Sequence, residues 1–389
     1  MAITRHTTAR RLAMSGTEAV ELERTVPWLL AEEGRITEEQ YYLTQPGLLA
    51  SSYVIPHDCV HTGYATWQML FGRPVRSLVD QIPDDDCRTR TATELAELAA
   101  QLPASATGTL AVVTPGSTHP GISGATATEE MAALVAGIED LADALSLPVV
   151  AIGNVRDEAA CADLRRVLRD RGYLAVTTGA DAMLDVPPGD LDSYFAGFRA
   201  NRRKVMRKER GRFLAAGPSV TVSGSDGLTA DLVDLQLERY SRYGHQVDTA
   251  AVLDRFRRAV TIPGLMVLRA DSAAGPLGFV GFYVDRPHRR IITRLGAFAR
   301  DDTACYFNLA YYELISYAAT AGGFRIHYGE STYRAKTARG CRLVRLNTYF
   351  RATDPNVHRI IADAGRIRTR LEEQQLSDAK TGVRDETNS

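Results

Sequence analysis

The sequence predicts an α/β protein, in the broad sense that includes α+β folds, with two domains. Three observations support this. The chain has 389 residues, more than one ordinary domain of roughly 100–200 residues contains. Patterns typical of helices and short strands alternate through the first half. In the second half, strand-like segments at 265–269, 278–284 and 290–297 are joined by turn-rich connections, which predicts an antiparallel meander.

The composition is that of a soluble globular protein, with 45% hydrophobic and 24% charged residues. The net charge of −1 provides no global attraction to nucleic acid or to a membrane. A polyanion would therefore have to bind a local patch. Because no apolar run approaches the ~18–20 residues that span a bilayer, and the N-terminus lacks an apolar signal segment, we expect a cytoplasmic protein with no membrane span.

The cysteines predict neither a disulfide framework nor a zinc ribbon. They are odd in number, widely scattered and contain no C-x-x-C pair: Cys59, Cys87, Cys161, Cys305 and Cys341. We interpret them as reduced thiols. His57, Cys59 and His61 form an H-x-C-x-H string, but a metal would need further ligands that the sequence does not indicate. We expect no metal site.

The first half shows no catalytic constellation. A short helix starts at Val26 and strand-like runs cover 41–55; further helices are predicted at 95–102, 129–145 and 158–171, and strands at 109–113, 149–152 and 173–178. The loop at 114–124 lacks both the P-loop Lys-Ser/Thr and the G-x-G-x-x-G pattern, so we interpret it as a surface loop.

The segment VPPGD at 186–190 marks a domain boundary, because two prolines and a glycine stop both helix and strand patterns. We therefore expect an N-terminal domain at 1–187, a C-terminal domain at 188–372 and a polar, disordered tail at 373–389. After the boundary, a basic segment at 192–214 is followed by a strand at 219–223 and helices at 228–243 and 250–260.

The basic segment predicts an amphipathic helix with an unusual excess of positive charge. Within 199–212 only Glu209 opposes eight cations: Arg199, Arg202, Arg203, Lys204, Arg207, Lys208, Arg210 and Arg212. Such a helix can be a solvated face, a membrane-surface helix or a polyphosphate-binding face. A merely solvated face normally mixes both signs, so we favour anion binding.

The segment from Gly296 to Phe350 carries the candidate chemistry. Apolar residues at helical spacing predict a helix at 306–319 that ends at Gly322-Gly323. A brief strand at 324–328 follows, then a loop that contains Glu330, Tyr333 and Lys336, and a last strand at 343–350.

Lys336 is exceptional because lysine itself is rare in this chain. Of the 46 Lys and Arg residues only four are Lys, which leaves 42 Arg. An ammonium is a compact charge that the planar guanidinium does not reproduce. We therefore interpret Lys336 as a functional residue, with a surface lysine as the alternative.

The second half resembles the GNAT acyltransferase core, in which the helix after the third meander strand points its N-terminus at the phosphates of the donor. More specifically, SYFAGFRANRRKVMRKERGRF, YFNLAYYELISYAATAGG and HYGESTYRAKTARGCRL resemble the Fem-type peptidyltransferases and related peptidoglycan-biosynthesis proteins. The resemblance covers 190–350 well and the first half in outline. It implies two tandem GNAT-like domains, each a mixed, largely antiparallel sheet flanked by helices.

The resemblance also implies an activity. In Fem-type ligases an aminoacyl-tRNA donates its aminoacyl group to an amine of a cell-wall precursor, and no resident cofactor is needed. Lys336 matches the lysine that stabilises the reacting carbonyl, although Ala335 replaces the usual preceding aromatic residue and Tyr333 lies three positions away. The candidates for contact with donor or acceptor are Arg199, Arg202, Arg203, Lys204, Arg207, Tyr306 and Asn308.

The chemistry agrees with this assignment. Aminolysis of an ester passes through an oxyanion, which a nearby ammonium stabilises. The attacking amine must lose a proton, and Glu330, Tyr333 or the ester oxygen could accept it. Two alternatives remain: an acyl-CoA-dependent N-acyltransferase and a non-catalytic binding module. The loop ARDDTACYFN lacks the glycines of a pyrophosphate loop and carries Asp301 and Asp302, which disfavours CoA. The acceptor could be a muropeptide precursor, a peptide or an amine-bearing secondary metabolite.

Overall fold

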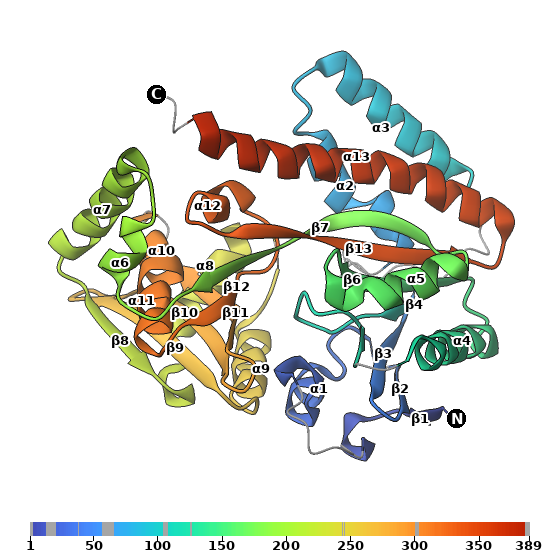
Figure 1. The fold of residues 1–389 in the computed structure, drawn as a ribbon, viewed down its shortest axis with the longest axis horizontal. Coiled ribbons are helices and arrows are strands. Elements are labelled where there is room, and N and C mark those ends of the chain that lie inside the picture. The colour runs from blue at the N-terminus through green and yellow to red at the C-terminus, as the bar shows by residue number, and fades with distance from the viewer. Residues whose placement is uncertain are drawn as a thin grey trace. The chain divides into compact units, whose positions relative to one another are not determined.

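The computed structural model describes residues 3–12, 21–37, 39–56, 66–103, 108–124, 127–242, 244, 246–299 and 303–385 (Figure 1). The chain forms two compact units. Unit 1 comprises Met1–Asp181 and Leu343–Ala379, and unit 2 comprises Ala182–Arg342 and Lys380–Ser389.

Unit 1 contains most of the first half of the chain together with a strand and a long helix from its end. Its strands are β1 (Thr4–His6), β2 (Gln40–Gln45), β3 (Leu48–Ile55), β4 (Thr109–Val112), β5 (Ile122–Ser123), β6 (Val149–Arg156), most of β7 (Leu174–Val186) and of β13 (Arg342–Ala352). Its helices are α1 (Val26–Glu32), α2 (Arg73–Val79), α3 (Asp85–Ala100), α4 (Thr128–Ala144), α5 (Ala162–Asp170) and most of α13 (Pro355–Asp385).

The sheet of unit 1 is mixed and largely antiparallel. The strand order is β1-β2-β3-β4-β6-β13-β7, with β5 paired to β3. Successive pairs from β1 to β4 are antiparallel, as is β6 with β13. β4 and β6 run parallel, with Leu110, Ala111 and Val112 opposite Val150, Ala151 and Ile152.

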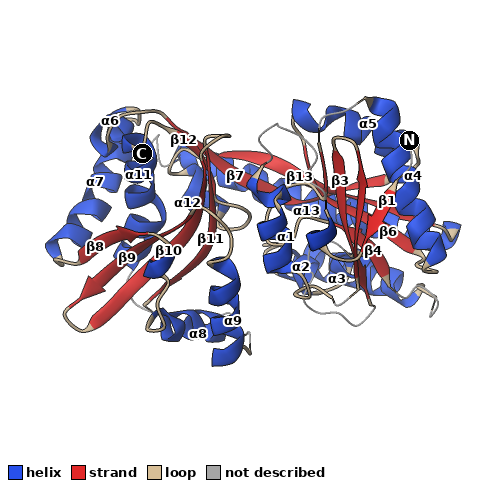
Figure 2. Cartoon of the chain, turned by 90° about the horizontal axis from the view of Figure 1, so that it is seen from below, coloured by secondary structure: helices blue, strands red, loops and turns tan. Residues whose placement is uncertain are grey.

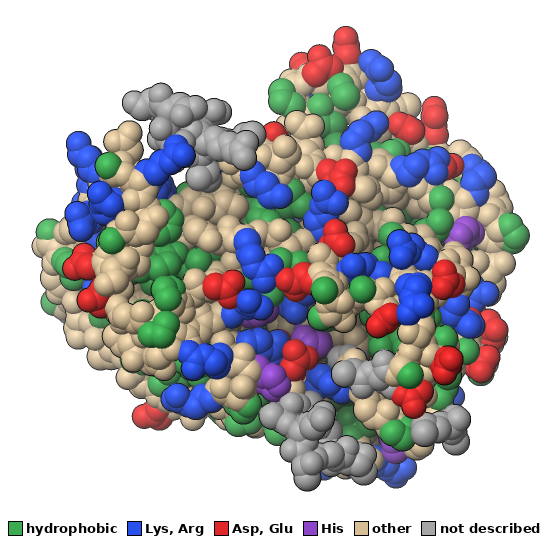
Figure 3. Space-filling view, viewed as in Figure 1, with side chains coloured by type: hydrophobic (Ala, Val, Ile, Leu, Met, Phe, Trp, Pro, Cys, Tyr) green, Lys and Arg blue, Asp and Glu red, His purple; other side chains and the backbone are tan. Residues whose placement is uncertain are grey.

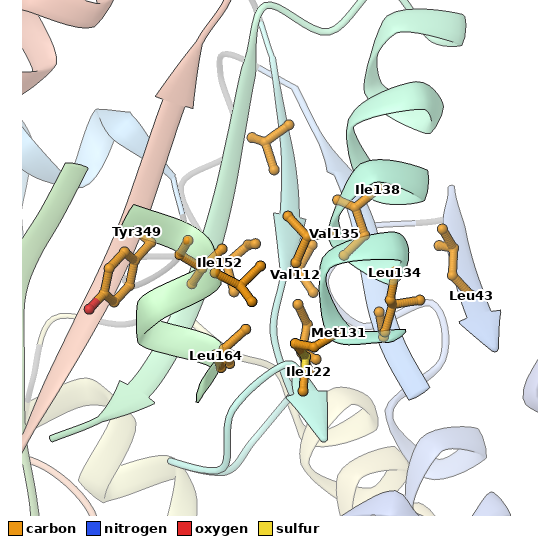
Figure 4. Packing of buried hydrophobic residues seen from close by; sticks show 14 of the residues in the cluster. Leu43, Val112, Ile122, Met131, Leu134, Val135, Ile138, Ile152, Leu164 and Tyr349 are labelled. Atoms are coloured by element: carbon orange, nitrogen blue, oxygen red, sulfur yellow. The ribbon is translucent and has the colours of Figure 1, made fainter. Parts of the chain in front are cut away.

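Alternate residues of the strands in unit 1 face two different hydrophobic cores. Val150 and Ile152 of β6 pack toward α4 and α5, where they meet Val135 and Leu164 (Figure 4). Val149 and Ala151 belong to the other core, beneath α2, α3 and α13. This period of two is the expected geometry of a strand that is buried on both faces.

Unit 2 is built from one continuous stretch of chain apart from its last residues. Its strands are β8 (Ser219–Ser223), β9 (Leu265–Ser272), β10 (Gly275–Asp285), β11 (Arg290–Phe298), β12 (Phe324–His327) and the end of β7. Its helices are α6 (Leu191–Ala196), α7 (Ala200–Ala215), α8 (Leu232–Arg242), α9 (Thr249–Ala259), α10 (Thr303–Phe307), a π-helical turn (Asn308–Glu313), α11 (Leu314–Thr320) and α12 (Tyr333–Thr337).

The predicted meander is present in unit 2. β8, β9, β10 and β11 pair in that order and antiparallel, and β12 joins β11 in parallel. β12 also pairs antiparallel with the end of β7. Figure 2 shows α6, α7 and α11 on one face of this sheet and α8 and α9 on the other. The predicted fold class, mixed sheets flanked by helices, is therefore confirmed.

The unit boundaries differ from the predicted ranges 1–187 and 188–372 at the end of the chain. Residues 343–372 belong to unit 1, because β13 pairs with β6 and α13 buries Ile360, Ala364 and Ile367 in a core of that unit. The prediction of a disordered tail at 373–389 is also wrong for residues 373–385, and residues 386–389 lie outside the described ranges. α13 continues to Asp385, and Leu376 and Ala379 remain buried.

Candidate active site

The two parallel strands of unit 2 separate after three residue pairs. Arg290, Ile291 and Ile292 of β11 pair with Arg325, Ile326 and His327 of β12. β11 then continues to Phe298, whereas β12 ends at His327. The Thr293 hydroxyl donates to the His327 carbonyl at 2.9 Å, where the strands part. We call this point the splay of β11 and β12.

Lys336 holds the chain that leaves the splay. Its Nζ donates to the carbonyl oxygens of Tyr328, Gly329 and Glu330 at 3.0, 2.9 and 2.6 Å. An ammonium has three N–H donors, so these three carbonyls match its full capacity. The side chain is 5% exposed, which contradicts the alternative of a surface lysine.

The backbone of this loop is strained next to the lysine. Gly329, Ser331 and Thr332 have φ values of 68°, 64° and 48°. A non-glycine residue in this region costs of order 1–3 kcal/mol, and such residues cluster at functional sites. Three carbonyls fixed by one ammonium are a physical means of keeping the loop in this conformation.

The remaining predicted catalytic residues come from the same loop. Tyr333 is buried and begins α12, so the segment that the sequence predicted as loop is in part a short helix. Glu330 is half-buried, and its carbonyl accepts the shortest of the three Lys336 bonds. The structure therefore brings Glu330 and Lys336 together and leaves the Glu330 carboxylate more accessible than the Tyr333 ring.

Helix 303–320 contains a π-helical turn at Asn308–Glu313, a feature frequent at functional sites. Tyr306 is half-buried in a cluster of rings, with centroids 5.1 Å from Phe298 and 5.8 Å from Tyr311. The Tyr311 ring lies 5.0 Å from that of Tyr328, at the splay. Burial raises the pKa of the Tyr311 and Tyr328 hydroxyls well above their usual value.

The sequence predicted a donor-binding role for Asn308, and the structure shows its side chain engaged within the fold. The side chain is fully buried. Its Oδ1 accepts from Arg210 at 3.1 Å, and its Nδ2 donates to the carbonyls of Glu209 and Ala304 at 3.3 and 2.8 Å. Because its amide is engaged within the protein, we assign Asn308 to the fold.

The predicted anion-binding residues of α7 separate into two groups. Arg202 donates to the Ala338 carbonyl at 2.6 Å, and Arg203 to the Phe198 carbonyl at 3.0 Å, so both are tied to the backbone. Arg210 is half-buried and pairs with Glu313. Five other cations are exposed and gather over α7 in Figure 3: Arg199, Lys204, Arg207, Lys208 and Arg212. The exposed group is the one able to meet phosphates.

The helix is also less amphipathic than the sequence predicted. Met206 and Phe213, seven residues apart, are its buried residues, whereas Val205 is 43% exposed and Leu214 56%. Cations therefore cover a wide arc of the surface of α7 instead of one side. Arg207 lies 4.0 Å from Asp192, and both side chains are exposed, so this pair neutralises little of the charge.

Two sequence features lie outside the described residues: His57, Cys59 and His61, and the loop residues Arg300, Asp301 and Asp302. In the described ranges, no three His, Cys, Asp or Glu side chains gather as a metal site would require. Among the helices of those ranges, none has the length and apolar character to cross a membrane.

Unit 1 has a surface groove that the sequence did not indicate. Its volume is 630 Å³, and it runs between the start of β7 and one face of α13. Arg366, Thr369 and Arg370 line it, together with Leu174 and Val176. No predicted site residue lies there.

Unit 2 has the element order that the resemblance implied. The antiparallel meander β9-β10-β11 leads into helix 303–320, and β12 then joins β11 in parallel. This is the element order expected of a GNAT acyltransferase core. Helix 303–320, β11 and β12 are the elements around the splay.

The sequence matches no family model and no curated protein. Among solved structures, the chain is similar to L-PGS from Bacillus licheniformis, at 13% identity and a TM-score of 0.46, over 64% of this chain and 81% of that chain. It is similar to FemX at 11% identity and 0.46, over 60% and 79%. A tandem GNAT protein from the clavulanic acid biosynthesis pathway gives 14% and 0.37, over 64% and 75%.

Proposed function

We propose that this protein is an N-acyltransferase that moves an aminoacyl group from an aminoacyl-tRNA to an amine of a small-molecule or peptide acceptor. The observation that supports the proposal most strongly is the buried ammonium of Lys336 at the splay of β11 and β12. A buried charge is costly unless it is hydrogen-bonded, and the partners of Lys336 include three neutral carbonyls. Here it lies beside a strained loop in the unit that also carries the exposed cations of α7.

The reaction that we propose is the aminolysis of an ester. The acceptor nitrogen attacks the carbonyl carbon of the aminoacyl ester, and a C–N bond forms as the C–O bond to the ribose breaks. The proton lost by the amine ends on the ribose oxygen that leaves. No covalent enzyme intermediate is required, because the amine is itself the nucleophile.

In this proposal Lys336 stabilises the oxyanion of the tetrahedral intermediate. All three of its N–H groups already have carbonyl partners, so the oxyanion must replace one of them. An oxyanion is a stronger acceptor than a neutral carbonyl. The exchange is therefore favourable only as negative charge develops, which is the condition for lowering the barrier.

The proton of the amine has three candidate acceptors. Glu330 is half-buried and belongs to the loop that Lys336 holds, whereas Tyr333 is buried in α12. The ester oxygen itself is the third. Accessibility favours Glu330 over Tyr333, and a general base of this kind contributes about 10²–10⁴-fold.

The exposed cations of α7 support a polyanionic donor. The side chains of Arg199, Lys204 and Arg207 are exposed, and little negative charge opposes them. Binding of a phosphate backbone requires positive side chains of this kind. An acyl-CoA donor is the alternative, disfavoured by the Asp301-Asp302 sequence in the loop before the helix. The acceptor is a cell-wall precursor, a peptide or an amine-bearing metabolite.

The test offers the purified protein charged tRNA and acetyl-CoA in parallel, each with a labelled acyl group, and follows label into small amines. We expect transfer from charged tRNA, with a donor KM that rises steeply with salt. Transfer from acetyl-CoA alone would replace the proposed donor. No transfer from either, with tight binding of an amine-bearing ligand, would favour a non-catalytic binding module.

A further inference from the structure

Arg339 is a buried arginine three residues after Lys336 of α12. The residue is 2% exposed. Its guanidinium carbon lies 3.8 Å from the centroid of the Phe307 ring and 4.9 Å from that of Tyr311. Nη1 donates to the Ala335 carbonyl at 2.9 Å, one residue before Lys336. The backbone N–H of Arg339 donates to the Lys336 carbonyl at 3.0 Å.

The partner of this arginine comes from α7. Nη2 of Arg339 donates to Oε2 of Glu209 at 2.7 Å. The same Oε2 accepts from the hydroxyl of Tyr312, in the π-helical turn. One carboxylate therefore joins three elements: the basic helix α7, helix 303–320 and the segment that begins at α12. Glu209 is the acidic residue that the sequence showed among eight cations, and here its charge is directed inward.

We infer that Glu209 and Arg339 form a positioning pair that sets the place of Lys336. This inference rests on the proposed function, in which Lys336 acts at the reacting carbonyl. Neither Glu209 nor Arg339 is assigned a contact with reactants. They act through Lys336: Glu209 fixes the guanidinium, the guanidinium fixes the Ala335 carbonyl, and Ala335 adjoins the lysine.

The geometry is specific to a planar, forked donor. Arg339 bonds a carboxylate with one nitrogen and a backbone carbonyl with another while its face covers the Phe307 ring. Lysine, a point charge, cannot satisfy all three at once. The Tyr312 hydroxyl, in helix 303–320, donates to the same Oε2 of Glu209. Tyr312→Phe therefore removes one hydrogen bond to this carboxylate and keeps its ion pair with Arg339.

α7 offers a matched control. Arg210, the next residue, pairs with Glu313 of the same π-helical turn. The Glu209 and Glu313 side chains are 20% and 17% exposed, so both pairs link α7 to helix 303–320 at similar depth. Their difference is that the contacts of Glu313 do not include Arg339. Glu313→Gln should therefore reproduce a general loosening of α7 without acting on Lys336.

The experiment measures hydrogen exchange of the full chain without substrate, in wild type and in Glu209→Gln, Arg339→Lys, Tyr312→Phe and Glu313→Gln. We expect the amides of 328–341 to exchange at least tenfold faster in the first two variants, about threefold faster in Tyr312→Phe, and within twofold of wild type in Glu313→Gln. Equal exchange of 328–341 in Glu209→Gln and Glu313→Gln would overturn the inference. If Glu209→Gln does not fold, Tyr312→Phe against Glu313→Gln decides by the same criterion.

A kinetic measurement separates this inference from the proposed function. With an active donor, Glu209→Gln and Arg339→Lys should lower kcat at least tenfold with little change in donor KM, while Glu313→Gln keeps kcat. A rise in KM at constant kcat would contradict positioning of Lys336. If 328–341 loosens as expected but no donor supports transfer, the proposed function fails and the pair still positions the lysine.

Discussion

Among the described residues, each unit has a parallel strand pair that ends after three residue pairs, β4 with β6 and β11 with β12, and the two pairs end in different ways. In unit 1, β4 leaves β6 and its loop folds back onto the strands. Val113 forms a bridge with Pro120, and Asn154 donates to the Ser117 carbonyl at 3.0 Å. Gly121 lies so close to Val112 that an added Cβ would be 2.3 Å from its carbonyl oxygen. In unit 2, Lys336 holds the loop after β12, and Tyr328 and Gly329 of this loop exchange backbone hydrogen bonds with Ala182 of β7.

The two units also differ in the partners of one buried charge. In unit 1, His119 contacts Glu21 and the Pro120 carbonyl, and Arg156 donates to Asp181 at 2.9 Å. Arg156 and Asp181 are matched to one another within the fold, as structural charges are, and unit 2 has similar pairs in Arg290–Asp285 and Arg339–Glu209. In unit 2, the ammonium of Lys336 is held by neutral carbonyls that an oxyanion can displace. The comparison favours unit 2 as the place of the chemistry.

The largest expected effect is that of Lys336→Ala. The variant should lose about 10²–10³ in kcat. Because three half-buried carbonyls each lose the hydrogen bond from Lys336, the free energy of unfolding should also fall, by about 3 kcal/mol. Lys336→Arg should recover little of either, since the planar fork does not fit three carbonyls around one point. Turnover and thermal melting measure the two effects.

Lys204→Ala, at an exposed lysine, is the control for stability and should keep the wild-type melting temperature. If Lys336→Ala kept more than a tenth of wild-type turnover, which corresponds to less than ~1.4 kcal/mol, the catalytic role would be wrong. Unit 2 would then not differ from unit 1 by a catalytic ammonium.

The second prediction concerns the pH dependence of unit 1. Burial, opposed by Arg368, raises the pKa of Glu372 to about 7, from a usual 4.5. The folded state therefore holds this proton more tightly than the unfolded state does. The resulting stabilisation is complete below pH 4.5 and is lost as the pH rises through about 7, by about 3 kcal/mol at most.

Glu372→Gln should flatten this part of the stability curve, measured by urea unfolding at several pH values. Hydrogen exchange should locate the effect in α13, where Arg368 donates to Glu372 at 2.8 Å. A wild-type curve that rises between pH 5 and 7, with no change in slope in the variant, would show that Glu372 does not control it.

The third prediction tests whether unit 1 takes part in the chemistry. His119 is 5% exposed, so His119→Ala should lower the free energy of unfolding by about 2 kcal/mol. It should leave kcat within twofold, because the proposed reaction uses residues of unit 2. Thermal melting and turnover of the same preparation measure both. A tenfold loss of kcat with unchanged melting would move part of the site into unit 1.

The smallest effect divides the cations of α7. Replacing Arg199, Lys204 and Arg207 with Gln should raise the donor KM about tenfold and lower the slope of log KM against log salt by roughly 2 to 3. The melting temperature should hardly change, since these charges are exposed. Replacing Arg202 and Arg203 should instead lower the melting temperature, because both bond backbone carbonyls. If the first three replacements lowered the melting temperature and the last two raised only the donor KM, the roles of the two groups would be exchanged.

The sequence predicted the meander, the helix at 306–319 and the fold class well, because alternation and glycine stops are local signals. It did not predict α13, although Val357, Ile360, Ala364 and Ile367 follow helical spacing. It also read the loop at 114–124 as surface, whereas His119 and Ile122 are buried. Burial of that loop depends on Asn154 and Glu21, contacts distant in the chain.

The candidate site was predicted in part. The rarity of lysine singled out Lys336, but its partners are backbone carbonyls, which no residue pattern reveals. The basic segment was clear, while the division of its arginines into exposed and backbone-bound groups depends on their angle around the helix and on Ala338. Arg339 was missed because it is one arginine among 42. The position of Arg339 in the sequence does not indicate a role until its contacts with the Phe307 and Tyr311 rings are known.

The strands of the meander and the site at the splay come from one stretch of chain, 182–342, whereas unit 1 needs residues from before and after it. During synthesis, the ribosome therefore delivers everything that the meander and the splay require while unit 1 still lacks β13 and α13. Until those elements emerge, the apolar faces of β6 and α2 that meet Phe350 and Ile360 in the finished core have no cover. Synthesis of unit 1 therefore starts before that of unit 2 and is completed after it. In that interval the apolar surface of unit 1 is prone to aggregation.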